Sequence, residues 1–458
     1  KKNKKNIEVL NSYNNIYFVG IGGVGMSSLA SYCLKKGKSV AGYDQTRNSL
    51  TIELENQGAK VQYTKNLLEI PNNFKSKDDT LIVYTPAIKL DNSILNYFNT
   101  NKFKLLKRSK LLGILSDKSF CIAIAGTHGK TTTMSILTHI FYENNLNFSS
   151  FVGGIMEKYN TNFIFKGDDI VLVEADEFDR SFLALKPNIA CITSIEPDHL
   201  DIYSGYSEIV NSFNDFTTSV DSDGHILKKY DLEIPGQSFG FNKSADYHIE
   251  NYNVREGSTF FDIVYKGGKC ENIKFNMSGK HNVLNALAAF SVCKKMDLSD
   301  IDIKESLSSF QGVKRRFSYV LKHPKVIIDD YAHHPTEIDV VFESLNSLYK
   351  EKKIMAIFQP HLFSRTKDFM SEFANVLSKF DEVILLDIYP ARELPMRGIN
   401  SNKLLSKINN KNKKIIDKKD LVSGIINSKC DVVAIMGAGD IGQEISKIKN
   451  KILIGNEL

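Results

Sequence analysis

The sequence lacks the cysteine patterns that hold metals or disulfide frameworks. Its six cysteines are scattered, and no two of them form a CxxC pair. Zinc sites and disulfide scaffolds both depend on close or regular cysteine spacing, so neither kind of site is expected. The two cysteines that lie in apolar runs, Cys121 and Cys191, are expected to be small residues of the core.

Long apolar runs and a concentrated basic segment are also missing. No stretch approaches the roughly 18 consecutive apolar residues that a membrane-spanning helix needs. The first residues, KKNKKNIEVL, are basic but lack the apolar stretch of a signal peptide. Lys and Asn are abundant throughout, and the net charge of +6 is small for 458 residues. We therefore expect a cytoplasmic protein that binds neither nucleic acid nor a membrane.

Strand-like apolar runs alternate with helical patterns along the whole chain, which predicts an α/β fold. At roughly 150 residues per domain, the length suggests about three domains. The predicted domains are 1–109, 110–318 and 319–458. Within the second domain, the residues from about Gly236 to Phe275 alternate short strand patterns and are expected to form a small β excursion.

The clearest chemical signal is GTHGKTTT, which starts at Gly126. An apolar strand leads into this glycine-rich turn and a helix follows, so backbone N–H groups and the helix N-terminus can cradle phosphates. Lys130 can reach the outer phosphates of a nucleotide, and the Thr131 hydroxyl can ligate magnesium. The loop is shorter than the generic GxxxxGK[ST] pattern, whose first glycine would fall at Ile124.

A run of carboxylates follows the next apolar strand, DIVLVEAD. The run comprises Glu174, Asp176, Glu177 and Asp179. These groups would repel one another without a counter-cation, and Mg²⁺ is the expected one because it binds carboxylate and phosphate oxygens together. His199 ends the following apolar strand. Since ligands gather at the carboxyl ends of strands in open α/β sheets, these groups are predicted to share the nucleotide site.

Two further glycine motifs match the dinucleotide pattern GxGxxG. GIGGVG spans Gly20 to Gly25, and the next strand ends at Asp44; GAGDIG spans Gly437 to Gly442. Alone, the first motif suggests an NAD-dependent dehydrogenase. Two dinucleotide sites beside a phosphate loop are implausible, so at least one match is expected to be a packing turn. The dehydrogenase remains a distant alternative, because it leaves GTHGKT unexplained.

A third cluster lies in the segments DDYAHHPTE and FQPHLFSRT. Its members are Tyr331, His333, His334, His361 and Arg365, all near strand ends. Histidines at such positions can orient ligands, and an arginine can clamp a carboxylate. Five such residues near two strand ends predict a binding site.

Taken together, the motifs resemble those of the Mur ligase family in order and spacing, over nearly the whole chain. They are GIGGVGM, GTHGKTTT, EADEFDRSFL, SIEPDHLDIY, GKHNVLNALAA, GVKRRF, DDYAHHPTE and GAGDI. The resemblance implies a Rossmann-like N-terminal domain for a UDP-sugar, a central P-loop ATPase domain with a mostly parallel sheet, and a Rossmann-like C-terminal domain that positions an amino acid.

The resemblance also implies an ATP-dependent ligase of peptidoglycan precursor synthesis that uses Mg²⁺. ATP would phosphorylate the lactyl carboxylate of UDP-N-acetylmuramate, and the amine of L-alanine would attack the acyl phosphate. A tetrahedral intermediate would then collapse to the amide, with release of phosphate. No obligate protein partner is implied.

By the same resemblance, individual residues take roles. The catalytic set is Lys130, Glu174 and His199, and the magnesium-linked set is Thr131, Glu174 and His199. The ATP-binding residues are Gly126, Thr127, His128, Gly129, Lys130, Thr131, Thr132, Asn282, Asn285 and Asp330. The UDP-sugar-binding residues are Gly22, Gly23, Val24, Gly25 and Arg316. The L-alanine-binding residues are Tyr331, His333 and Arg365.

Two stretches depart from the family pattern at the amino-acid end. Leu362 stands where many members carry a second arginine, and ARELP replaces an AGE-type stretch after DIYP. If both arginines usually contact the amino-acid carboxylate, this chain must use Arg365 alone or a substitute. A ligase that attaches a recycled tripeptide to UDP-N-acetylmuramate therefore stays open as the alternative. A non-enzymatic nucleotide-binding regulator is disfavoured, because it has less need of the magnesium-linked residues.

Overall fold

The computed structural model describes residues 10–89, 91–196, 205–255, 258–391 and 393–455. The chain divides into two compact units. Unit 1 comprises 1–255, 259–276 and 282–311; unit 2 comprises 256–258, 277–281 and 312–458. Among the described residues, no helix combines the length and apolar character that crossing a membrane requires.

The N-terminal part of unit 1 is a five-stranded parallel sheet in the order β3-β2-β1-β4-β5. Its strands are β1 (Asn15–Val19), β2 (Ser39–Tyr43), β3 (Lys60–Gln62), β4 (Thr80–Tyr84) and β5 (Lys104–Lys107). The helices are α2 (Val24–Lys35), α3 (Ser49–Asn56), η1 (Leu67–Glu69), η2 (Asn72–Phe74), α4 (Ser93–Thr100) and α5 (Arg108–Ser116). β1 is buried throughout and lies where the strand order reverses, so the glycine turn that follows it lies at the usual ligand crevice.

The second sheet of unit 1 has ten strands in the order β15-β14-β13-β12-β11-β10-β6-β9-β7-β8. They are β6 (Phe120–Ala125), β7 (Phe148–Met156), β8 (Thr161–Phe165), β9 (Ile170–Ala175), β10 (Ile189–Ile192), β11 (His225–Lys229), β12 (Gln237–Gly240), β13 (Tyr247–Arg255), β14 (Ser258–Tyr265) and β15 (Gly268–Phe275). The helices are α6 (Lys130–Glu143), η3 (Phe178–Ala184), α7 (Tyr206–Thr218), α8 (Lys280–Lys295) and α9 (Asp300–Ser309).

This central sheet is parallel from β13 to β7 and antiparallel at the pairs β14–β15 and β7–β8. The predicted β excursion is therefore not separate from the sheet. β12 pairs in parallel with β11, so the strands from β12 to β15 extend the central sheet to one edge.

The two sheets of unit 1 share one apolar core. Helix α2 packs on β7 and β8, and the ring of Tyr32 contacts those of Phe151 and Phe163. The buried amide of Asn162, on β8, donates to the backbone carbonyl of Val24 (2.7 Å). The first turn of α2, directly after the glycine turn, is thereby fixed against the central sheet.

Unit 2 holds a six-stranded sheet in the order β16-β17-β21-β18-β19-β20, parallel except for β16. Its strands are β16 (Ser318–Leu321), β17 (Val326–Asp330), β18 (Ile354–Phe358), β19 (Glu382–Leu385), β20 (Lys413–Ile415) and β21 (Val432–Met436). The helices are α10 (Pro335–Leu348), α11 (Phe363–Asp368), α12 (Met370–Leu377), α13 (Ser401–Lys407), η4 (Lys418–Asp420), α14 (Leu421–Asn427), η5 (Asp440–Glu444) and α15 (Ile445–Gly455).

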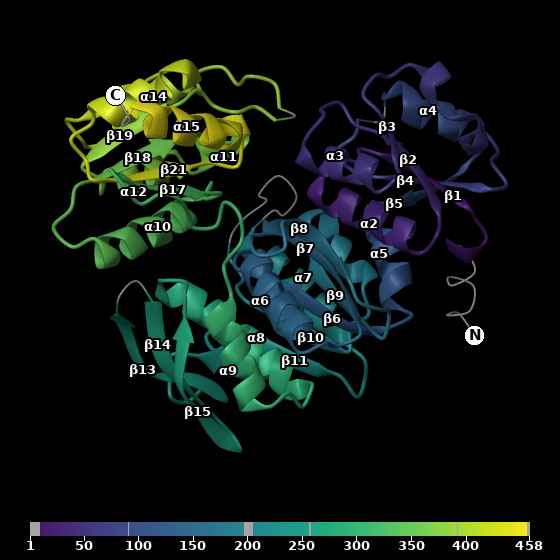
Figure 1. Cartoon of the computed structure of the whole chain (residues 1–458), viewed down its shortest axis with the longest axis horizontal. Helices are drawn as coiled ribbons and strands as arrows, with labels where there is room; N and C mark the ends of the chain where they lie inside the picture. Colours follow the sequence, from purple (N-terminus) through teal and green to yellow (C-terminus); the bar gives the residue numbers. More distant parts are fainter. Residues whose placement is uncertain (1–9, 90, 197–204, 256–257, 392, 456–458) are drawn as a thin grey trace. The chain divides into compact units, whose positions relative to one another are not determined.

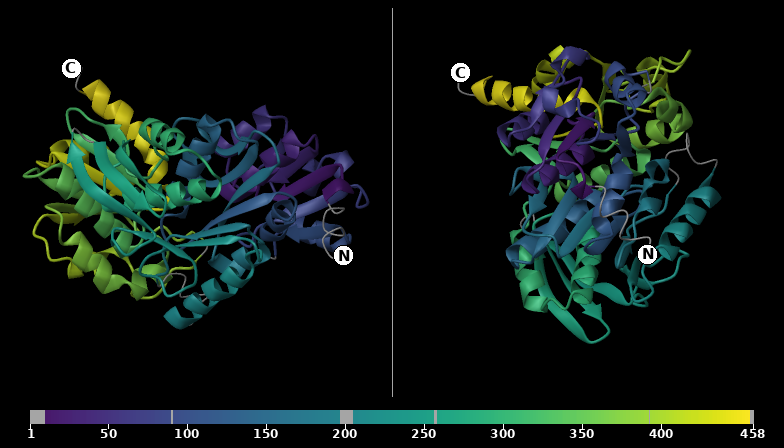
Figure 2. Two further views of the ribbon diagram at one scale, coloured as in Figure 1. Left: turned by 90° about the horizontal axis from the view of Figure 1, so that it is seen from below. Right: turned by 90° about the vertical axis from the view of Figure 1, so that its right-hand side faces the viewer.

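Two helical layers cover the sheet of unit 2 (Figure 1). Helices α10 and α12 pack on one face, and α14 and α15 pack on the other. The last of these, α15, leads to the C-terminus in both views of Figure 2. The α/β class and the organisation around three sheets are thus as the sequence predicted. The domain boundaries stay predictions; α5 begins at Arg108 and β16 begins at Ser318.

Candidate active site

The phosphate loop connects the buried strand β6 to helix α6, and two of its glycines have conformations that L-residues rarely adopt. Gly126 has φ +136° and Gly129 has φ +82°. A Cβ atom on Gly129 would lie 2.5 Å from Oδ1 of Asn285. Glycine is therefore needed at position 129 both for the backbone turn and for the close approach of helix α8.

Two side chains that directly follow strand β10, those of Thr193 and Ser194, form hydrogen bonds with this loop. The backbone N–H of His128 donates to Oγ of Ser194 (2.7 Å), and Oγ1 of Thr127 lies 3.0 Å from the same hydroxyl. Thr193 donates through its hydroxyl to the carbonyls of Ala125 and His128. Both supporting residues are buried. No motif in the sequence marks them, because a Thr-Ser pair after an apolar strand has no distinctive pattern.

Lys130 begins helix α6 and is held at the loop by two groups. Its Nζ donates to the carbonyl of Gly126 and lies 2.9 and 2.7 Å from Oε1 and Oε2 of Glu177. Burial lowers the pKa of Lys130, but the carboxylates of Glu177, Asp176 and Glu174 outweigh it and raise that pKa. The ammonium of Lys130 is therefore held in its charged form.

Thr131 and Glu174, both assigned to magnesium from the resemblance, are hydrogen-bond partners. Oγ1 of Thr131 donates to Oε2 of Glu174 (3.1 Å), and the other carboxylate oxygen accepts from the N–H of Gly153. A hydroxyl and a carboxylate are hard oxygen ligands that suit Mg²⁺. His199, the third predicted ligand, lies outside the described residues, as does the side chain of Asp179. Within the described part of the chain, no cluster of three His, Cys, Asp or Glu side chains is poised to hold a metal.

Two of the carboxylates that follow Glu174 lie beside cations of the protein. Oδ2 of Asp176 lies 3.1 Å from Nη2 of Arg108, and Glu177 meets Lys130. The repulsion predicted from the sequence is thus relieved inside the protein. Arg108 was not singled out by the sequence reasoning, because its partner lies 68 residues further along the chain.

Asn282 and Asn285 lie on helix α8, and both are buried. Oδ1 of Asn285 accepts a long hydrogen bond from Oγ1 of Thr133 (3.3 Å). With the contact to Gly129, this bond makes Asn285 a neighbour of the phosphate loop. The contact of both asparagines with adenine stays a prediction. Thr132, also predicted to bind ATP, is buried in the first turn of α6.

The N-terminal glycine turn includes Gly22, and Val24 begins helix α2. The N–H of Gly22 donates to Oδ2 of Asp44 (2.8 Å), and the N–H of Thr46 donates to its other oxygen (3.1 Å). Asp44 thus braces the turn itself, which explains its position without a nicotinamide cofactor. A Cβ atom on Gly25 would lie 2.5 Å from Nη1 of Arg108, the arginine that pairs with Asp176.

The second glycine motif, GAGDIG, is a packing turn. A Cβ atom on Gly437 would lie 2.8 Å from the backbone oxygen of Gln359. One on Gly439 would lie 2.8 Å from Cβ of Tyr389, and one on Gly442 would meet the guanidinium of Arg315. Side chains and backbone of the same unit therefore fill the space that a side chain at each of these three positions would need.

In unit 2, the three predicted L-alanine residues belong to one chain of contacts. The rings of Tyr331 and His333 are 5.3 Å apart, and those of His333 and His361 are 6.1 Å apart. Nη1 of Arg365 lies 3.5 Å from Nδ1 of His361. Tyr389, which the sequence reasoning missed, stacks on His361 with 5.7 Å between ring centroids.

Arg316 and Asp330 lie beside this cluster. The guanidinium of Arg316 lies 5.3 Å from the ring centre of Tyr331. The oxygens of Asp330 accept the N–H groups of Phe317 and Ala332, each at 2.7 Å. Burial raises the pKa of Asp330 to about 6, although Arg316 and the two backbone donors oppose the shift. A ribose would have to use the remaining lone pairs of this carboxylate, so that role stays a prediction.

His334, another member of the predicted cluster, and Glu393 of the ARELP stretch both hold the start of a helix. Nδ1 of His334 accepts from the N–H of Thr336 (3.3 Å) and so caps helix α10. In the ARELP stretch, Glu393 accepts from the N–H of Ser364 (3.0 Å) at the start of helix α11, which carries Arg365. Leu362, at the position of the missing arginine, has φ +71°.

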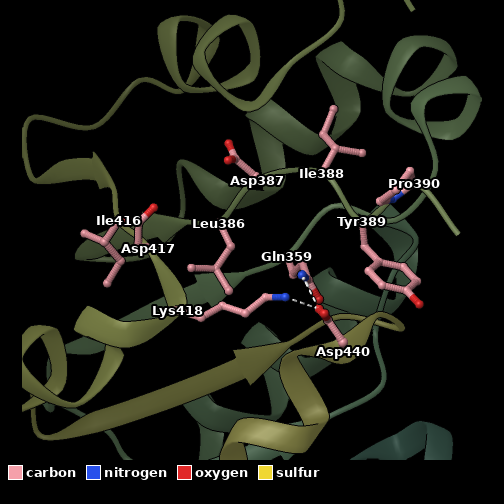
Figure 3. Close-up of a pocket in the computed structure, with 10 residues that line it drawn as sticks. All are labelled: Gln359, Leu386, Asp387, Ile388, Tyr389, Pro390, Ile416, Asp417, Lys418 and Asp440. Atoms are coloured by element: carbon pink, nitrogen blue, oxygen red, sulfur yellow. Dashed lines mark hydrogen bonds and ion pairs between the residues drawn. The ribbon is translucent and has the colours of Figure 1, made fainter. Parts of the chain in front are cut away.

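A pocket of about 400 Å³ opens at the carboxyl ends of strands β18 to β21 (Figure 3). Its lining residues are Gln359, Leu386, Asp387, Ile388, Tyr389, Pro390, Ile416, Asp417, Lys418 and Asp440. Figure 3 shows the Lys418 ammonium and the Gln359 amide both pointing at Asp440. Because Tyr389 lines the pocket and also stacks on His361, the pocket adjoins the histidine cluster.

Family models match all three parts of the chain. They are "Mur ligase family, catalytic domain" over residues 15–119, "Mur ligase middle domain" over 124–293, and "Mur ligase, glutamate ligase domain" over 315–439. Among curated proteins, UDP-N-acetylmuramate–L-alanine ligase of Christiangramia forsetii is 48% identical over 97% of this chain and 99% of its own length. The protein of the same name from Flavobacterium psychrophilum is 46% identical over 97% of this chain and 99% of its own length.

Solved structures with the same architecture include a UDP-N-acetylmuramate–alanine ligase from Thermotoga maritima. It is 26% identical, has a TM-score of 0.81, and the match covers 96% of this chain and 99% of that chain. A murein peptide ligase from Psychrobacter arcticus has a TM-score of 0.71 at 21% identity, over 95% of this chain and 98% of that chain. At that identity the second likeness concerns the fold alone.

Proposed function

This chain belongs to the Mur ligase family, and on that premise we propose that it joins L-alanine to the lactyl carboxylate of UDP-N-acetylmuramate at the expense of ATP. The observation that carries the proposal is the 48% identity, over almost the full length of both chains, to a protein named for this reaction. The phosphate loop supports the proposal, because Lys130 begins the helix that follows the glycine turn and the Thr131 hydroxyl lies beside Glu174.

The first step makes the carboxylate reactive. A carboxylate is a poor acyl donor, and transfer of the γ-phosphoryl group gives it a good leaving group while ADP is released. Two anions must approach each other in this step, so the site needs positive charge where negative charge develops. Lys130 and the N-terminus of helix α6 supply that charge from the protein. Glycines 22, 23 and 25 with Val24, and Arg316, are assigned to the UDP-sugar.

Thr131, Glu174 and His199 are the residues that we assign to magnesium. The hydroxyl and carboxylate oxygens of Thr131 and Glu174 lie 3.1 Å apart, and oxygen atoms are the ligands that Mg²⁺ prefers. When bound, the ion would neutralise charge on the phosphate oxygens. The protein's own part is to hold these two side chains at the loop.

The second step forms the amide. The amine of L-alanine attacks the acyl carbon, and the tetrahedral intermediate collapses with loss of inorganic phosphate. We assign Arg365 to the amino-acid carboxylate and Tyr331 and His333 to positioning the amino acid. His361 and Tyr389 connect these side chains, so the group is held as one cluster. The cytoplasmic location expected from the sequence belongs to the same proposal.

An isotope experiment tests the acyl-phosphate step. UDP-N-acetylmuramate labelled with ¹⁸O in the lactyl carboxylate is incubated with ATP and L-alanine, and the phosphate released is analysed by mass spectrometry. One ¹⁸O atom should appear in each phosphate, because the leaving group carries one carboxylate oxygen. Release of unlabelled phosphate would rule out an acyl phosphate.

A further inference from the structure

Lys130 contacts a carboxylate that no step of the reaction uses. Both oxygens of Glu177 lie within hydrogen-bond distance of Nζ, at 2.9 and 2.7 Å. The side chain of Glu177 is 2% exposed and that of Lys130 is 16% exposed. The pair is therefore shielded from water, so the attraction between its two charges is screened less than that of a pair at the surface.

The position of Glu177 gives this contact a consequence for the nucleotide. Glu177 directly precedes η3, whereas Lys130 starts helix α6 at the phosphate loop. A nucleotide phosphate in the loop would need the same ammonium that Glu177 now holds. A phosphate and a buried carboxylate beside one ammonium also repel each other. Binding of the nucleotide therefore requires an exchange of partners at Lys130.

We propose that Glu177 is a positioning residue that holds Lys130 at the phosphate loop in the free enzyme and yields it to the nucleotide phosphates. Because the contact with Glu177 must be broken first, the nucleotide binds more weakly than it would if Lys130 had no carboxylate partner. When ADP leaves, Glu177 binds the ammonium again. The inference rests on the nucleotide-binding part of the proposed function. It does not depend on which amino acid is joined.

The test is ADP binding to the full-length enzyme, measured by calorimetry with and without Mg²⁺. In Glu177→Gln, the carboxylate charge is lost while the size of the side chain is kept. We expect the Kd for ADP to fall at least about fivefold, because the phosphates no longer compete with a carboxylate. The KM for ATP should fall in the same direction. A merely structural role would raise both constants, since a damaged loop binds more weakly.

Asp176→Asn is the matched control. It removes the same charge from the neighbouring position, but Asp176 makes its ion pair with Arg108 and acts on Lys130 only through its charge, without a hydrogen bond. We expect its Kd for ADP to stay within about twofold of the wild-type value. Glu177→Asp is the second variant, in case the glutamine protein does not fold. Its shorter side chain cannot keep both contacts, and we expect an intermediate Kd.

Three results would overturn the proposal. An unchanged or raised Kd for ADP in folded Glu177→Gln would show that Lys130 is not held back by Glu177. Weaker binding only when Mg²⁺ is present would make Glu177 a metal ligand. An equal fall of the Kd for ADP in Asp176→Asn would show that the effect comes from the loss of any negative charge nearby, and not from the contact between Glu177 and Lys130. Because ADP binding needs neither sugar nor amino acid, each of these results is distinguishable from a failure of the proposed ligase activity.

Discussion

At the scale of single residues, several polar side chains of the site have a specific hydrogen-bond or ion-pair partner. Lys130 is held by Glu177, and Thr131 donates to Glu174. Asp44 braces the glycine turn, and Arg365 is linked to the histidine cluster through His361. Such fixed groups lose little freedom when substrate binds, which favours catalysis by positioning.

Lys130→Ala should abolish ligation while leaving the sugar site intact. We expect kcat to fall by at least about 100-fold, because the main protein cation at the transferred phosphoryl group is lost. Phosphate release measures turnover, and calorimetry measures the Kd for UDP-N-acetylmuramate, which should change less than about twofold. Near-normal turnover would refute the role of Lys130.

Arg365→Ala should raise the KM for L-alanine far more than that for ATP. The reason is that a guanidinium which clamps the amino-acid carboxylate does not contact the nucleotide. Steady-state kinetics with each substrate varied in turn give both constants, and Arg365→Lys is the matched variant that keeps the charge. Equal effects on the two constants would mean that Arg365 is a structural residue, as its burial would also allow.

The raised pKa of Asp330 predicts a pH dependence of stability. The folded-state pKa is about 6, above the ordinary value of 3.8, so the folded protein holds this proton more tightly than the unfolded chain. The stability that this group contributes is therefore fully present below the ordinary pKa and is lost as the pH rises through about 6, by on the order of 3 kcal/mol. Urea unfolding of the wild type and of Asp330→Asn at pH 4 and pH 6.5 measures the difference. If the difference in unfolding free energy between the wild type and Asp330→Asn were the same at both pH values, the raised pKa of Asp330 would be contradicted.

At the scale of single elements, local patterns predicted strands, glycine turns and the phosphate loop, because these depend on neighbours in sequence. The loop from Gly126 to Thr132 joins β6 to α6 as the pattern indicates. Contacts that join distant segments could not be predicted in this way. Ser194 beneath the loop, Arg108 beside Asp176 and Asn162 against α2 all depend on how elements pack. No short motif marks these residues.

Gly129→Ala should damage the phosphate loop through two effects. The left-handed φ of +82° strains an alanine, and its Cβ would lie 2.5 Å from Oδ1 of Asn285. We expect a loss of roughly 1–3 kcal/mol in unfolding free energy together with a large fall in ATP affinity.

Gly267→Ala is the control for the strain alone. Gly267 has φ +111°, and an added Cβ there meets no atom within 4 Å. The unfolding free energy of Gly267→Ala should fall by a similar amount, because the backbone is strained in the same way, while the affinity for ATP stays at the wild-type level. Parallel loss of ATP affinity in both variants would show that general destabilisation, rather than the loop, explains the effect.

At the scale of the whole molecule, the family and the three-sheet α/β fold predicted from the sequence are confirmed. The shared core of unit 1 places the glycine turn and the phosphate loop on one packed body. The histidine cluster belongs to unit 2. The residues proposed to hold L-alanine therefore belong to unit 2, whereas the phosphate loop belongs to unit 1.

The choice of amino-acid substrate tests the proposed function most directly. Phosphate release is measured with UDP-N-acetylmuramate and ATP, and with either L-alanine or the tripeptide L-alanyl-γ-D-glutamyl-meso-diaminopimelate. L-Alanine should support turnover and the tripeptide should not, with UDP-N-acetylmuramoyl-L-alanine as the product. Turnover with the tripeptide alone would contradict the assignment and make the chain a recycling ligase.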